Sequence, residues 1–128
     1  MNREELNLLS ERIIGCAIEV HKHLGPGLLE SAYRECLGYE FDLDGMNYKK
    51  EYAIPLFYKG KQINCSYRID YLVENEIIIE LKSVEQILPI HKAQLLTYLK
   101  ITDKRLGLLI NFNVNLLTKG IVRLVNNF

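Results

Sequence analysis

The sequence lacks the features that mark secreted and membrane-embedded proteins. Its 128 residues include only three cysteines, an odd number without any CxxC spacing, which predicts reduced thiols rather than a disulfide framework. No apolar run approaches the roughly 18 residues that a membrane span needs. The amino terminus also lacks the apolar segment of a signal peptide. We therefore expect a cytoplasmic protein with no membrane partner.

An excess of charge of either sign is also missing. The 16 basic and 16 acidic residues cancel, so total charge gives no support for a sequence-blind nucleic-acid binder, although a local basic patch is compatible with it. The chain has no P-loop, no GxGxxG and no GxSxG motif. Its length and its 48% hydrophobic content fit one globular domain over residues 1–128.

What the sequence does contain begins with helical periodicity. Asn2 can cap a helix that continues to Leu24, where Gly25-Pro26-Gly27 ends it. A second apolar pattern of helical spacing covers residues 29–43. A third helix is predicted from Pro89, a residue suited to the first helical position, to about residue 100.

Between the second and third helices, and again after the third, the pattern indicates strands. From Tyr48 the apolar residues alternate, which predicts three strands joined by turns at residues 59–60 and 74–76. Pro55 places the first of these strands at a sheet edge or at a bulge. Two later strands are predicted in RLGLLINF and GIVRLV. The expected fold is α/β with mixed α+β character, a central mixed sheet of about five strands flanked by about three helices.

The length of the second turn decides whether two acidic residues meet. A three-residue turn pairs Val73 with Ile77 and sets Asp70 directly opposite Glu80. A two-residue turn would instead pair Asp70 with Ile79 and send the two carboxylates to opposite faces. The three-residue turn also sorts the neighbouring apolar residues sensibly, so we favour it.

Like charges placed opposite each other destabilise a hairpin unless a cation lies between them. Mg²⁺ prefers oxygen ligands and is typically held by one or two carboxylates together with water and phosphate. Lys82 shares a strand face with Glu80 and could orient a water or offset charge on a phosphate. The alternative is that Glu80 and Lys82 form an ordinary solvated strand face.

Two helices offer further polar residues. His91, Gln94 and Tyr98 follow helical spacing and form one stripe, which either borders the core or contacts a substrate. Glu30 lies in the first turn of the second helix, where the helix dipole favours an anion. Glu30 could equally be a plain helix-start residue, and Tyr33, one turn later, a core residue.

These residues together resemble a known family. GPGLLESAY contains Gly27, Glu30 and Tyr33 at GxxExxY spacing, and the sequence resembles the GxxExxY proteins of the PD-(D/E)xK nuclease superfamily over nearly its whole length. RIDYLVENEIIIELK resembles the core hairpin of that superfamily, with Asp70 at its metal-binding aspartate and Glu80-Leu81-Lys82 at its ExK. Gln94 and Tyr98 are similar to the QxxxY motif of the RecB-like branch.

The resemblance implies a restriction-endonuclease-like core and Mg²⁺- or Mn²⁺-dependent hydrolysis of phosphodiester bonds, with DNA favoured over RNA. The alternative is a nuclease fold that binds nucleic acid or protein without cleaving. A domain this small could need a homodimer to grip its substrate. The implied metal ligands are Asp70, Glu80, Glu30 and the backbone carbonyl of Leu81. The implied catalytic residues are Asp70, Glu80, Lys82 and Glu30, and the implied substrate contacts are Gln94, Tyr98, His91 and Tyr33.

Overall fold

The computed structural model describes all 128 residues as three helices and a five-stranded sheet with one short 3₁₀ turn. The sheet has the order β1-β2-β3-β4-β5, and only the β3–β4 pair is parallel. This is the restriction-endonuclease-like α/β arrangement that the sequence predicts. The elements in chain order are α1 (Arg3–Leu24), α2 (Glu30–Leu43), β1 (Tyr48–Tyr58), β2 (Lys61–Val73), β3 (Ile77–Lys82), α3 (Pro89–Thr102), β4 (Leu106–Asn111), η1 (Leu117–Gly120) and β5 (Ile121–Val125).

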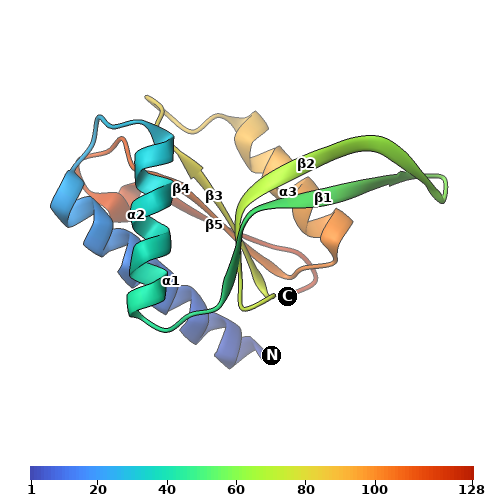
Figure 1. Ribbon diagram of the computed structural model, residues 1–128, viewed down its shortest axis with the longest axis horizontal. Helices are drawn as coiled ribbons and strands as arrows, with labels where there is room; N and C mark the ends of the chain where they lie inside the picture. Colours follow the sequence, from blue (N-terminus) through green and yellow to red (C-terminus); the bar gives the residue numbers. More distant parts are fainter.

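The sheet separates two hydrophobic layers. Helices α1 and α2 cover one face and α3 covers the other (Figure 1). In β3, Ile77 and Ile79 pack toward α1 and α2, whereas Ile78 packs toward α3. Such burial on both faces is typical of a strand in the parallel part of a sheet. None of the helices is long and apolar enough to cross a membrane.

The helix ends follow the sequence signals closely. The Asn2 side chain accepts a hydrogen bond from the Glu5 N–H at 2.8 Å, and the Glu5 carboxylate accepts one from the Asn2 N–H at 3.3 Å. This reciprocal pair is the predicted capping arrangement. Gly25, with φ 66°, ends α1 in a conformation that suits glycine, and Pro89 is the first residue of α3.

The β1–β2 hairpin extends well beyond the rest of the sheet. Only residues 71–73 of β2 pair with β3, whereas β1 follows β2 almost to its tip. We call residues 52–69 the arm; Figure 1 shows it curving away from the sheet past α3. β1 is an edge strand, and the register shifts between Pro55 and Leu56, so the prediction from Pro55 is confirmed.

The base of the arm is part of the hydrophobic core. Ile54 and Ile69 are buried in the same cluster as Leu95, Tyr98 and Leu99 of α3. The arm is therefore fixed to α3 at its base, while β2 and β3 separate at the same level. Asp70 lies at this point of separation, immediately before the last three paired residues of β2.

Candidate active site

The β2–β3 turn gives the register that brings the two acidic residues together. Val73 pairs with Ile77 and Tyr71 pairs with Ile79, as the three-residue turn requires. The next step along both strands sets Asp70 beside Glu80. Regular pairing stops there because the arm bends away, and Glu51, on the neighbouring strand β1, has a φ of 49°, which is rare outside glycine.

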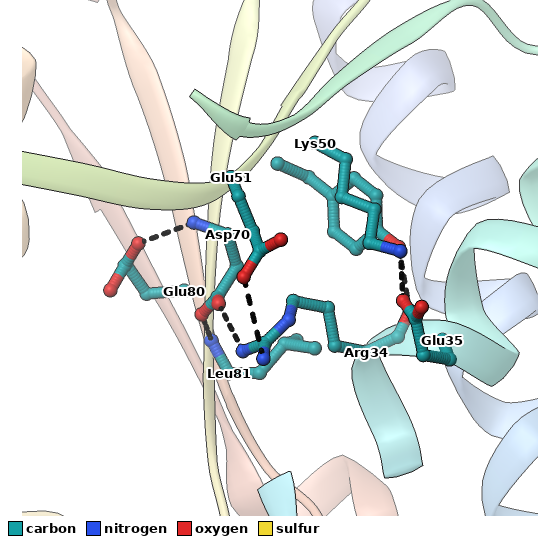
Figure 2. Close-up of polar contacts among 8 residues, drawn as sticks. Arg34, Glu35, Lys50, Glu51, Asp70, Glu80 and Leu81 are labelled. Atoms are coloured by element: carbon teal, nitrogen blue, oxygen red, sulfur yellow. Dashed lines mark hydrogen bonds and ion pairs between the residues drawn. The ribbon is translucent and has the colours of Figure 1, made fainter. Parts of the chain in front are cut away.

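The two carboxylates take over the hydrogen bonds that the separated strands no longer make. The Asp70 N–H donates to Oε1 of Glu80 at 2.9 Å. The Leu81 N–H donates to Oδ2 of Asp70 at 2.7 Å. Figure 2 shows this exchange at the edge of β3. Because each acid satisfies a backbone donor of the other strand, both side chains are held next to each other.

Burial makes this pair electrostatically costly without a cation. Glu80 is only 8% exposed. Its burial, followed by the charge of Asp70, raises the Glu80 pKa to about 8, against smaller lowering effects from the Asp70 N–H and Lys82. Burial and then the charge of Asp70 also raise the pKa of Glu30. A divalent cation would favour the ionised form of all three carboxyl groups.

Arg34 supplies part of the positive charge that the paired carboxylates require. This residue was not predicted from the sequence. Its Nη1 lies 3.0 Å from Oδ1 of Asp70, and its Nη2 lies 3.6 Å from Oε1 of Glu51 (Figure 2). The Arg34 carbonyl accepts a hydrogen bond of 2.6 Å from the Tyr71 hydroxyl, which fixes this turn of α2 against the sheet. The signal was available, because Arg34 follows Glu30 by four residues and therefore shares its helix face.

Leu81 and Lys82 complete the strand side of the site. The Leu81 N–H faces β2, and in an extended strand the carbonyl of the same residue points to that side too. Lys82 is half-buried at the end of β3 and takes part in none of the ion pairs. Its charge nevertheless lowers the pKa of both Glu30 and Glu80.

Two loops meet behind these residues. The Ser83 hydroxyl donates to the Leu28 carbonyl at 2.6 Å, joining the segment after β3 to the one before α2. The buried Asn111 side chain donates to the Val84 carbonyl at 2.9 Å and accepts from the Val84 N–H at 3.1 Å. Neither residue was singled out from the sequence, because both bonds join segments far apart in the chain. Together they fix the loop that follows Lys82.

The interpretation of Tyr33 as a substrate contact is corrected by its surroundings. Its side chain is fully buried and stacks on Phe112 with ring centroids 4.4 Å apart. Its hydroxyl donates to the Gly25 carbonyl at 2.6 Å and accepts from the Leu28 N–H at 3.1 Å. Tyr33 is thus a core residue that ties down the loop leading into Glu30.

The polar stripe of α3 divides into three environments. Nδ1 of His91 accepts the Leu88 N–H at 3.0 Å. Gln94 is exposed and lines a groove between α3 and the arm. Tyr98 borders the same groove, and its pKa is raised by burial and next by the charge of Glu80. Two residues of the stripe, Gln94 and Tyr98, therefore line the groove.

The oxygen donors suit a hard divalent cation, although the side chains do not surround one by themselves. No group of three or more histidine, cysteine, aspartate or glutamate side chains is arranged to hold a metal ion. Asp70, Glu80 and the Leu81 carbonyl provide two carboxylates and one neutral oxygen. That set fits Mg²⁺, which usually keeps several of its waters.

The chain matches a known protein family over most of its length. Residues 7–124 match the PD-(D/E)XK nuclease superfamily, and the chain belongs to that superfamily. Neither the curated proteins nor the solved structures compared with it give a significant match. The narrower resemblance to the GxxExxY proteins and to the QxxxY branch stays a prediction.

Proposed function

We propose that the protein is a Mg²⁺- or Mn²⁺-dependent nuclease that hydrolyses phosphodiester bonds, with DNA as the favoured substrate. The observation that carries the proposal is the hydrogen-bonded pair of Asp70 and buried Glu80 at the end of the β2–β3 ladder. A buried carboxyl group whose pKa is raised by burial and by a neighbouring acid is typical of a functional site, which supports the proposal.

In this proposal the metal is held by Asp70, Glu80 and the Leu81 carbonyl, with Glu30 acting directly or through a water. A bound Mg²⁺ lowers the pKa of its water and offsets negative charge on the phosphate. Arg34 must release or share Oδ1 of Asp70 for the cation to use that atom. The superfamily supports a nuclease-like fold, and these roles are our assignment.

The remaining residues act on the water and the substrate. Lys82 extends from the end of β3 with no ion-pair partner, so its ammonium is available to position the attacking water or to stabilise the phosphate. Because Nδ1 of His91 accepts a backbone N–H, the neutral ring carries its proton on Nε2 and can donate to a phosphate oxygen. Gln94 and Tyr98 orient the nucleic acid alongside.

Cleavage assays on single-stranded, duplex and branched DNA and on RNA, with Mg²⁺ or Mn²⁺, test this function. We expect Glu80→Gln and Lys82→Met each to lower the rate by about 100-fold or more. Glu85→Gln, at an exposed glutamate in the loop after β3, is the matched control and should cleave like the wild type. Equal rates for the wild type and Glu80→Gln would exclude the catalytic assignment.

Binding without cleavage is the second candidate, and the Arg34–Asp70 ion pair favours it. An arginine that already neutralises Asp70 reduces the need for a metal. Thermal melts with and without Mg²⁺ separate the two candidates. A site occupied at 100 times its dissociation constant adds about 2.7 kcal/mol to the free energy of unfolding. The nuclease proposal expects such stabilisation in the wild type and its loss in Glu80→Gln, whereas a pure binding module expects neither.

A further inference from the structure

The arm carries a concentration of positive charge that the neutral total conceals. Residues 52–69 contain Lys59, Lys61 and Arg68 and no acidic residue. The rest of the chain therefore holds all 16 acidic residues but only 13 of the 16 basic residues. All three basic side chains of the arm are on exposed residues. This is the local basic patch that a phosphate backbone would recognise.

Aromatic rings accompany these charges. Phe57, Tyr58 and Tyr67 are all exposed. A group of large aromatic side chains left uncovered on the surface is typical of an interaction site. Tyr58 also lies under the Lys59 ammonium at 5.5 Å from the ring centroid. Exposed rings beside basic side chains are the surface that binds unpaired bases by stacking and their phosphates by charge.

Of these rings, Tyr67 lines a groove between the arm and α3. The groove encloses about 350 Å³ and is lined mainly by apolar side chains, with Gln94 as a polar group on its α3 wall. Tyr67 of the arm and Tyr98 of α3 both line it and pack against each other, with ring centroids 5.9 Å apart and ring planes tilted by 45°. Tyr98 also belongs to the same hydrophobic cluster as Ile69, the residue immediately before Asp70. The groove therefore lies near the acidic site.

We propose that the arm and α3 bind single-stranded nucleic acid, with an unpaired base in the groove against Tyr67 and the phosphates along Lys59 and Lys61. An unpaired base exposes its ring face for stacking, whereas a paired base in a duplex offers only its edge. The link between this surface and cleavage rests on the function proposed above, but the binding itself does not.

A second copy of the chain is the competing occupant, because β1 is an edge strand and the groove is apolar. Charge argues against it. Two arms that pair edge to edge would bring six basic side chains together without one acid from either arm, and such juxtaposition is repulsive. A polyanion gains from the same charges, so we assign the surface to nucleic acid.

Fluorescence anisotropy in EDTA tests the proposal without cleavage. The probes are a labelled oligothymidylate of about 12 nucleotides, within the range of site sizes of single-strand binders, and a duplex of the same length. We expect tighter binding of the single strand. Tyr67→Ala should weaken it by about 5- to 150-fold, as expected for the loss of one stacked base, and Tyr67→Phe should restore most of the affinity.

Two further variants separate stacking, charge and folding. Tyr39→Ala removes another exposed tyrosine, from α2 and outside the arm and its groove, and should bind like the wild type with an unchanged melting temperature. The double variant Lys59→Ala/Lys61→Ala should reduce the slope of log affinity against log salt by about 1.4, because each lost phosphate contact contributes about 0.7 for single strands.

Three results would overturn the proposal. They are tighter binding of the duplex, single-strand affinity that Tyr67→Ala leaves unchanged, and a dimer in sedimentation that the same variant dissociates. Failure of the proposed nuclease function has a different signature. In that case cleavage and Mg²⁺ stabilisation are absent, but Tyr67-dependent binding of the single strand in EDTA persists.

Discussion

The guanidinium of Arg34 lies 3.0 Å from Oδ1 of Asp70, so an arginine occupies one of the oxygens that a metal ion would use. Arg34→Met removes this competing charge. We expect it to tighten Mg²⁺ binding, measured by isothermal titration calorimetry. In EDTA it should lower the free energy of unfolding by about 2 kcal/mol, the cost of losing a charged hydrogen bond in a partly buried setting.

The control for that prediction is another arginine–aspartate pair of the same length. Arg12 lies 3.0 Å from Asp44, but about half of each side chain is exposed. Exposed pairs contribute little, so Arg12→Met should cost under about 1 kcal/mol and leave Mg²⁺ binding unchanged. Equal Mg²⁺ affinity in Arg34→Met and the wild type would contradict the competition between arginine and metal.

Glu80 makes the stability of the metal-free protein depend on pH. Its pKa is raised to about 8 in the folded state by burial, then by Asp70, with Glu30 adding to the effect. The unfolded chain therefore releases this proton near pH 4.5, whereas the folded chain keeps it until about pH 8. Stability should accordingly fall as pH rises from about 4.5 to 8 and then level off.

Urea denaturation in EDTA at intervals from pH 5 to pH 9 measures this slope. Glu80→Gln keeps an oxygen for the Asp70 N–H but cannot ionise, so we expect a flatter profile and greater stability than the wild type at pH 8. Saturating Mg²⁺ should also flatten the wild-type profile, because the cation favours the carboxylate. Parallel profiles for the two proteins in EDTA would contradict the raised pKa.

Tyr33→Phe isolates the hydroxyl that ties the loop between α1 and α2. The ring can stay stacked on Phe112, but the bonds to the Gly25 carbonyl and the Leu28 N–H are lost. We expect a loss of about 1–3 kcal/mol in urea denaturation. Tyr39→Phe, at an exposed tyrosine of the same helix, should stay within about 0.5 kcal/mol of the wild type.

Gly38 marks a close approach between α2 and the sheet. A Cβ atom there would lie 2.5 Å from the Tyr71 hydroxyl, which is the group that bonds the Arg34 carbonyl. Gly38→Ala should therefore cost about 1–3 kcal/mol in urea denaturation.

Gly15→Ala in α1 serves as the control, because it should change the free energy of unfolding in the opposite direction. No atom lies within 4 Å of its Cβ position, so Gly15→Ala should stabilise the protein by up to about 1 kcal/mol through helix propensity alone. A loss of stability in both variants would indicate that crowding at Tyr71 is not the cause.

The sequence predicts this fold well wherever structure follows from local periodicity. The sorting of apolar residues favoured the three-residue turn and so the observed β2–β3 register, because a slip by one residue would set Asp70 opposite Ile79. The caps at Asn2 and Pro89 are equally local. The position of Asp70 beside Glu80 follows from this register and needed no knowledge of the tertiary structure.

What could not be predicted depends on how distant segments pack. The role of Arg34 requires α2 to lie over β2, and the buried position of Tyr33 requires Phe112 from the other end of the chain. The projection of the arm from the sheet could not be predicted either. Strand periodicity does not show that residues 61–70 of β2 have only one neighbouring strand. Its basic surface emerges only once that separation is known.

Asp70 and Glu80 complete the end of the β2–β3 ladder with their own side chains. They therefore have a structural role in addition to the proposed binding of the metal. A descendant of this protein that had stopped cleaving would still need both acids to finish its sheet. Mutational drift after loss of activity should therefore spare them and reach Lys82 first, because that side chain is in none of the ion pairs. Among related sequences, the lysine is accordingly the better marker of a working enzyme than either acid.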